Sequence, residues 1–281
     1  MYIQTLPRKK NYSIIIKIIL AIWAVVQIFP IYWLITFSLK NNVEIFEGNM
    51  IGLPNIWRFE NYKYAFMGGN LSRYLLNSII VTGVTILFVS MFSLMASYAL
   101  VRMKWKLRKF MITFFLMGLT IPIHAALLPV FIILRNAHLL NSYWALIIPY
   151  TAFAIPMAIL INSGFVSALP VELEEAACID GCTIYGTFFK IILPLMRPSI
   201  ATIAIFTFLQ SWNELMYAVV FISDAKYKTL TVGIQSLVGQ YTTDWGPIGA
   251  GLVVATLPVI IIYLILNKQV QSSLIAGSVK G

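Results

Sequence analysis

The stretch EEAACIDGCTIYGTFFKIILP, from Glu174 to Pro194, separates two hydrophobic blocks of the chain. It begins with acidic residues, continues with small ones and ends with apolar residues before a proline. A connection that only had to join two apolar segments would not need this length or this pattern. The segment therefore predicts a folded element with a task of its own.

The hydrophobic blocks identify the chain as a membrane protein. Of its 281 residues, 60% are hydrophobic and 11% are charged, whereas soluble domains carry about 25% charged residues. An apolar run of roughly 20 residues is long enough to cross a bilayer as a helix. The sequence predicts an all-α polytopic protein with six transmembrane helices, at residues 13–39, 75–101, 110–134, 143–165, 199–222 and 249–267. The first run is too long for a cleaved signal peptide, so an uncleaved helix is expected there.

The basic residues predict the orientation. The short loop RMKWKLRK at residues 102–109 is strongly basic, and such loops stay on the cytoplasmic side. With six helices, both termini are then cytoplasmic, in a bacterial-type inner membrane. Basic residues that flank helices at an anionic leaflet also explain the formal net charge of +10 without nucleic acid.

In this topology the opening segment lies in the cytoplasm, and its residues predict a helix, a turn and a second helix. Pro170 suits the first position of a helix, and Glu172, Glu174 and Glu175 suit its first turn because the helix dipole favours acids there. Gly181 is a natural stop. A second short helix is expected over residues 183–193, closed by prolines. A protruding element of this kind suggests docking into a partner, although an ordinary structured loop is the alternative.

The same residues carry a family resemblance. The spacing of EAA, three residues, Gly, nine residues and I-x-L-P resembles the EAA loop of the inner-membrane permease subunits of ABC importers. The matching residues are Glu175, Ala176, Ala177, Asp180, Gly181, Ile191, Leu193 and Pro194. The stretches LLNSYWALIIPY, SWNE, TLTVGIQSL and DWGPIGAG, and the C-terminal AGSVKG, resemble sugar-importer permeases similar to the second, six-span permease of the maltose transporter.

The resemblance implies a type I importer fold and a division of labour between subunits. The EAA helix would be a coupling helix, inserted into a groove of a cytoplasmic ATPase, and two ATPases would bind ATP and Mg. A second, different permease and an extracytoplasmic sugar-binding protein would complete the assembly. The C-terminal tail would contact the ATPases, through Gly277, Val279, Lys280 and Gly281. The outer loop at residues 223–248 would face the binding protein, and residues 231–245 would reach into its sugar cleft.

The residues themselves agree with a transport subunit that is not an enzyme. The chain contains no G-x-x-x-x-G-K-[ST] run, so it is not expected to bind ATP through a Walker motif. No catalytic set or metal site is predicted, and no cofactor is expected on this chain. The resemblance implies three regions: residues 1–74 with the first helix and an outer loop, the permease core at 75–267 with the coupling helix at about 170–193, and the tail at 268–281.

One carboxylate lies inside a predicted membrane helix, and two functions are open for it. Intramembrane acids are costly and indicate function by default. Gln210, Asn213, Glu214 and Tyr217 have the spacing of one helical face. That face predicts either contacts with sugar hydroxyls along the pathway or hydrogen bonds that pack the fifth helix. An ion-coupled secondary transporter is the alternative function, but it calls for more buried ionisable groups than this one. The sequence does not name the sugar, since glycerol-phosphate-type and oligosaccharide importers share this pattern.

Overall fold

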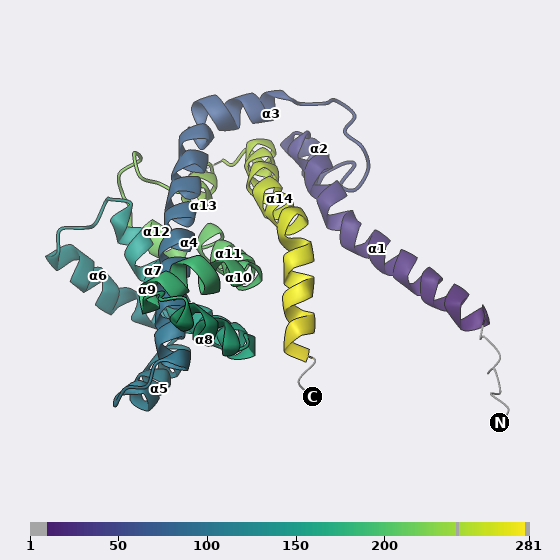
Figure 1. Cartoon of the computed structure of the whole chain (residues 1–281). Helices are drawn as coiled ribbons and strands as arrows, with labels where there is room; N and C mark the ends of the chain where they lie inside the picture. Colours follow the sequence, from purple (N-terminus) through teal and green to yellow (C-terminus); the bar gives the residue numbers. More distant parts are fainter. Residues whose placement is uncertain (1–9, 240–241, 279–281) are drawn as a thin grey trace. The chain divides into compact units, whose positions relative to one another are not determined.

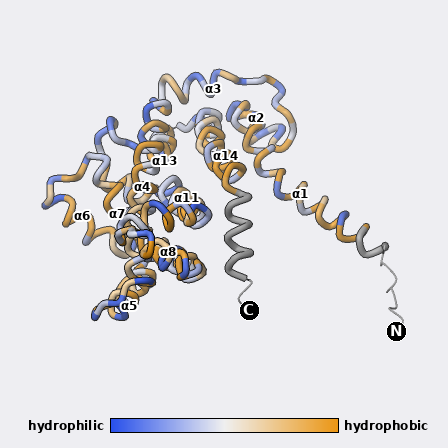
Figure 2. The backbone as a smooth tube through the Cα atoms, viewed as in Figure 1, coloured by the Kyte–Doolittle hydropathy of each residue, from blue (hydrophilic) through white to orange (hydrophobic). Residues whose placement is uncertain are grey.

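The computed structural model describes residues 10–239 and 242–278, with side chains from residue 14 to 239 and from 242 to 266. Every described residue in regular secondary structure is helical (Figure 1). The chain divides into two compact units, Met1–Gly69 with Leu237–Val254, and Asn70–Ser236 with Ala255–Gly281. Hydrophobic residues run along the long helices, and hydrophilic residues gather in connections such as the one around α3 (Figure 2).

Four helical segments are long and apolar enough to cross a membrane. They are Ile14–Ser38, Leu71–Arg102, Trp144–Ala168 and Trp245–Leu266. Two bent pairs, Arg108–Gly118 with Ile123–Asn136 and Ile184–Leu195 with Arg197–Trp212, meet the same test when each pair is taken together. The described residues thus hold four to six candidate spans. Three of the predicted runs correspond to single helices. The run at 13–39 is α1 (Lys10–Ser38), the run at 75–101 is α4 (Leu71–Arg102) and the run at 143–165 is α7 (Trp144–Ala168).

The third and fifth predicted helices are not single straight helices, and these two predictions are wrong in that respect. The third consists of α5 (Arg108–Gly118), a 3-10 turn η2 (Ile123–Ala126) and α6 (Leu127–Asn136), with a bend of 94°. The break precedes Pro122, whose ring disfavours helical backbone in the residue before it. The fifth consists of α11 (Arg197–Trp212) and α12 (Met216–Phe221). The last helix, α14 (Trp245–Ser278), is longer than predicted and runs into the predicted tail.

The first unit contains α1, α2 (Asn42–Phe46), α3 (Glu60–Lys63), the π-helical turn η1 (Tyr64–Gly68) and the start of α14. The loop that follows α1 is built around the fully buried Lys40. The Lys40 ammonium donates to the carbonyl oxygens of Asn49 and Gly52, at 2.5 and 2.7 Å. Burial lowers the pKa of Lys40, and the nearby carboxylate of Glu44 opposes that shift. The short α2 and α3 lie in connections without hydrophobic periodicity, so the sequence did not predict them.

Close approach of two helices explains one glycine of this unit. A Cβ at Gly249 of α14 would lie 2.5 Å from a ring carbon of Phe37 and 3.0 Å from the Cα of Ser38, at the end of α1. Gly249 therefore lets the backbones of α14 and α1 approach each other. Asn42 fixes the neighbouring turn, because its amide group donates to Thr243 O and accepts from Trp245 N.

The second unit is organised around α4, α7 and α11, which pack against one another. Tyr150, Tyr217 and Phe221 belong to its main apolar cluster and are almost completely buried. Polar contacts join the same helices. Asn162 of α7 donates to Ser93 of α4 at 3.0 Å and accepts a hydrogen bond from Ser199 of α11. Hydrogen bonds between small polar side chains are a common way to hold membrane helices together.

Replacing Asn162 by leucine should therefore weaken the three-helix core. Two interhelical hydrogen bonds are lost, each of the order of 0.6 kcal/mol in membrane proteins, so we expect a loss of about 1 kcal/mol and a lower Tm in detergent. Replacing the adjacent, partly exposed Ser163 by alanine is the control. Equal melting temperatures for the Asn162 variant and the unmodified chain would contradict this role.

Candidate functional site

The predicted docking element exists as two short helices joined by a tight turn. The first, α8 (Glu172–Ile179), carries Glu172, Glu174 and Glu175 in its first turn, where acids stabilise the helix dipole. The prediction that Pro170 begins this helix is wrong, because Pro170 lies two residues before it. Leu169 has the extended backbone typical of a residue before proline, with ψ at 138°.

The turn after α8 is closed by backbone hydrogen bonds. Gly181 N donates to Cys178 O at 3.0 Å, and Cys182 N donates to Ala177 O at 2.9 Å. This pair of bonds is the Schellman motif, which needs a left-handed residue after the helix. Gly181 supplies that residue with φ at +75°, and a Cβ built on it would meet nothing within 4 Å. The requirement for glycine therefore comes from the backbone angle and not from crowding within the chain.

Substituting Gly181 by leucine should strain this turn. A non-glycine residue in the left-handed region costs about 1–2 kcal/mol, so we expect a lower Tm in detergent and weaker association with a cytoplasmic partner. Gly181→Asn is the matched control, because asparagine tolerates the left-handed region better than leucine does. Equal partner binding by the leucine and the unmodified chains would argue against a docking role for this turn.

The second limb of the element returns to the second unit's core. It begins at Thr183, whose hydroxyl accepts a hydrogen bond from Gly186 N, and includes α9 (Ile184–Thr187), the π-helical turn η3 (Phe188–Ile192) and α10 (Leu193–Leu195). The expected second helix at 183–193 is therefore present, with a π-helical turn inside it. Pro194 lies inside α10 and does not close the limb, which ends at a bend of 71° before α11.

The docking element has an inner and an outer side. Phe188 and Ile192 are buried in a cluster with Leu94 and Tyr98 of α4 and Val166 of α7. Among the predicted coupling residues, Ala177 is buried, whereas Ile191 and Leu193 are half-buried. The exposed ones are Glu175, Ala176, Asp180, Gly181 and Pro194.

The outer side ends in an apolar tip that the sequence analysis did not single out. Ile179, Ile184 and Tyr185 are 87%, 49% and 72% exposed. These three side chains flank the Gly181 turn, so we call them the apolar tip. An exposed isoleucine is unremarkable alone, but three large apolar residues around one rigid turn suit insertion into an apolar groove.

A second contact missed from the sequence ties α8 to the helices behind it. The Glu174 carboxylate lies 2.8 Å from Nε of Arg102, at the end of α4. The Tyr98 hydroxyl donates to the other oxygen of Glu174 at 3.2 Å. In the sequence, Arg102 counts only as a basic residue at a helix end, and no local pattern pairs it with an acid more than 70 positions away.

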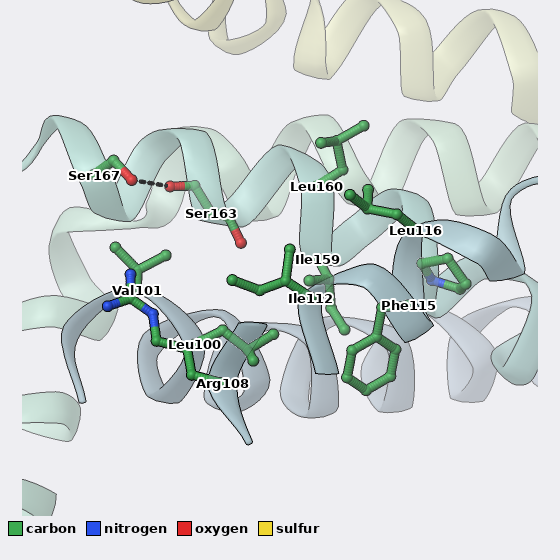
Figure 3. A pocket seen from close by; sticks show the side chains of 11 residues that line it. Leu100, Val101, Arg108, Ile112, Phe115, Leu116, Ile159, Leu160, Ser163 and Ser167 are labelled. Atoms are coloured by element: carbon green, nitrogen blue, oxygen red, sulfur yellow. Dashed lines mark hydrogen bonds between the residues drawn. The ribbon is translucent and has the colours of Figure 1, made fainter. Parts of the chain in front are cut away.

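Beside Arg102, an apolar groove runs between the end of α4, α5 and α7. Its volume is about 250 Å³, and it is lined mostly by aliphatic side chains, with Arg108 and the hydroxyls of Ser163 and Ser167 among them (Figure 3). Ser167 donates to the backbone carbonyl of Ser163, so that hydroxyl is already satisfied within α7.

Glu214, the carboxylate predicted to lie inside a membrane helix, caps the break between α11 and α12. Glu214 is 8% exposed, and its carboxylate accepts from Tyr217 N at 3.0 Å, from Ala218 N at 3.3 Å and from the Tyr150 hydroxyl at 2.8 Å. It thus satisfies amide groups that the start of a helix leaves without intrahelical partners.

The prediction that Gln210, Asn213, Glu214 and Tyr217 share one helical face is wrong. The helix stops at Trp212, so the i, i+4 spacing does not carry through the break. Glu214 and Tyr217 are buried, whereas Gln210 and Asn213 are exposed. Gln210 and Thr207 line a cavity of about 290 Å³ between α5, α7 and α11. Asn213 donates to Leu209 O at 2.9 Å.

The predicted outer loop and tail differ from expectation. Residues 230–235 of the loop form the helix α13 (Leu230–Gln235), and a Cβ on Gly233 would overlap the ring of Tyr74. This part of the predicted loop is therefore packed helix. In the predicted tail, Gly277 lies in the last turn of α14, and Val279, Lys280 and Gly281 lie outside the described residues.

Comparison with known proteins places this arrangement in one family. Residues 89–275 match the family described as binding-protein-dependent transport system inner membrane component. The chain is 36% identical over 277 residues to the probable ABC transporter permease protein YurM of Bacillus subtilis, covering 98% of this chain and 92% of that protein. It is 34% identical over 271 residues to the diacetylchitobiose uptake system permease protein NgcG of Streptomyces coelicolor, covering 96% of this chain and 89% of that protein.

A solved structure shows the same fold. A chain of the bacterial ABC transporter involved in the import of the acidic polysaccharide alginate superposes with a TM-score of 0.81, at 20% identity, over 95% of this chain and 99% of that one. The family match covers most of the chain, and the two relatives align over nearly all of it. The chain therefore belongs to the family of binding-protein-dependent transport system inner membrane components, and it is a permease subunit of an ABC importer.

Proposed function

We propose that this permease forms half of the transmembrane pathway for a sugar or oligosaccharide that an extracytoplasmic binding protein delivers. The relative from Streptomyces coelicolor is named for diacetylchitobiose uptake, and it aligns over nearly the whole chain. The family description itself specifies binding-protein-dependent transport. The substrate class rests on the name of this relative, and delivery by a binding protein rests on the family description.

The other subunits are inferred from the docking element. Two copies of a cytoplasmic ATPase, with ATP and Mg, supply the energy, because the chain has no Walker motif of its own. A second, different permease supplies the other half of the pathway. In this assembly α5 with α6 and α11 with α12 each count as one span, which gives six. Both termini then face the cytoplasm, as the basic loop at 102–109 indicates.

The observation that carries the coupling role is the exposed outer side of α8 with its apolar tip. Ala176, Asp180 and Gly181 lie on that side together with Ile179. Glu175 adds a charge that suits a basic partner residue. Ala177, Ile191 and Leu193 pack inward and Pro194 lies beyond the turn, so these four shape the element without forming its outer surface. The tail residues Gly277, Val279, Lys280 and Gly281 are a second proposed ATPase contact.

The residues around Glu214 divide between two roles. Gln210 lines the cavity between α5, α7 and α11, so we assign it and the exposed Asn213 to the pathway. Glu214 and Tyr217 are buried and fully engaged within the chain, which favours packing for both.

Reconstitution tests the proposal. The binding protein encoded beside the chain is screened against mono-, di- and trisaccharides by thermal shift, and the stabilising sugar is used in radiolabelled form. We expect uptake into proteoliposomes only when the permeases, the ATPase, the binding protein and ATP are all present. Uptake by this chain alone, driven by a proton or sodium gradient, would overturn the proposal.

A further inference from the structure

Arg102 joins three separate elements through one side chain. Its Nε pairs with Glu174 of α8, while Nη2 donates to the carbonyl oxygens of Val166, at 2.9 Å, and Leu169, at 2.5 Å, at the end of α7. The side chains of Arg102 and Glu174 are 13% and 17% exposed. A planar guanidinium holds several acceptors in fixed directions, and its charge is favourable at a helix C-terminus.

Tyr98 completes this arrangement one turn earlier on α4. Residues four apart lie on the same helical face, so Tyr98 and Arg102 reach the two oxygens of the same carboxylate. The Tyr98 ring also packs on Phe188 of the second limb, with ring centroids 5.3 Å apart. Both limbs of the docking element are thus attached to one face of α4.

Without these side chains, the link between α7 and α8 would be weak. The chain leaves α7 through the extended Leu169 and the exposed Pro170, and α8 begins two residues later. A single-chain connection of this kind can act as a hinge. Arg102 bridges it, since the same guanidinium holds the last carbonyls of α7 and an acid in the first turn of α8.

We propose that Arg102, Glu174 and Tyr98 form a clamp that transmits movement of α8 to the membrane helices α4 and α7. The inference rests on the proposed docking of α8 to an ATPase. The three side chains are positioning residues, because they lie on the inner side of α8 and leave the apolar tip free. Turning α8 relative to α4 and α7 would separate the partly buried Glu174 carboxylate from both Arg102 and Tyr98 and leave it unpaired, so the elements move together.

The test separates docking from transmission. In the assembled importer, Cys178 and Cys182 are replaced by serine, so that this chain has no other thiol. A cysteine introduced by Gln210→Cys then reports how accessible the cavity between α5, α7 and α11 is. Vanadate traps nucleotide on the ATPases, and the rate of maleimide labelling is measured before and after trapping. With the clamp intact, we expect trapping to change the labelling rate about fivefold. In Arg102→Gln and Glu174→Gln we expect less than a twofold change, with copurified ATPase and trapped nucleotide unaltered.

Further variants make the result specific. In the double variant Arg102→Gln/Glu174→Gln, the change in labelling rate on trapping should be no smaller than in either single variant, because the two residues act through one contact. Tyr98→Phe keeps the ring and loses one hydrogen bond, so an intermediate response is expected even if the charge variants fold poorly. Lys106→Gln removes an exposed charge from the same basic loop and should respond like the parent.

Two results would overturn the clamp. One is an unchanged labelling response in the variants, and the other is loss of ATPase from Arg102→Gln, which would assign Arg102 to assembly. Failure of the parent chain to copurify any ATPase would instead refute the proposed docking itself.

Discussion

Ile179→Asp is expected to abolish copurification of the ATPase while leaving the permease folded. Ile179 is the most exposed member of the apolar tip, at 87%, so its replacement removes no internal contact of the chain. Apolar anchors at the centre of an interface contribute about 2–4 kcal/mol each, and an aspartate there would also be buried without a partner. We therefore expect association to weaken by about two orders of magnitude, measured by pull-down of the ATPase at graded concentrations.

The matched control makes the same chemical change elsewhere. Ile56 is 65% exposed in the loop between α2 and α3 of the first unit, and Ile56→Asp should bind the ATPase normally. Both variants should elute like the parent in size-exclusion chromatography. Normal ATPase binding by Ile179→Asp would show that the apolar tip is not the docking surface.

Glu214→Ala is expected to cause the largest loss of stability among single substitutions in the second unit. The change leaves two backbone amides and the Tyr150 hydroxyl without their acceptor in a buried place. Each unsatisfied buried donor costs about 1–3 kcal/mol, so a loss of about 3 kcal/mol or more is expected, visible as a large drop in Tm in detergent.

Glu214→Gln separates packing from transport. Its remaining carbonyl oxygen can still accept one or two of these hydrogen bonds, so we expect a smaller drop in Tm and normal uptake per folded molecule. If this variant lost uptake while its Tm stayed unchanged, Glu214 would belong to the transport pathway and not to the packing of the helices. A melting temperature of Glu214→Ala equal to that of the parent would contradict the capping role.

The sequence predicted most of the fold because a membrane helix is recognisable from a single continuous apolar run. Long apolar runs gave α1, α4 and α7 to within a few residues, and the acidic turn followed by Gly181 gave the docking element. The errors arose where distant residues decide the geometry. The break at residues 213–215 depends on Glu214 capping the next helix and on Tyr150 from α7, so a continuous 3.6-residue period was the wrong template there.

The candidate site was predicted only in its local part. The EAA resemblance identified which residues form α8, but not which of them face outward. The contact of Glu174 with Arg102 and Tyr98 spans more than 70 positions, and a single sequence contains no pairing information over that distance. Likewise, the apolar tip depends on the exposure of Ile179 and Tyr185 in the folded chain, whereas their residue types alone suggest ordinary core residues.

The Gly181 turn affects how a partner would meet this surface. Because its backbone hydrogen bonds form within the chain, the turn that carries the tip is ordered before any encounter. Association then costs little conformational entropy, and more of the contact energy remains as affinity. A surface that is ordered in advance can be released and bound again repeatedly without refolding, which suits the proposed coupling to a partner ATPase.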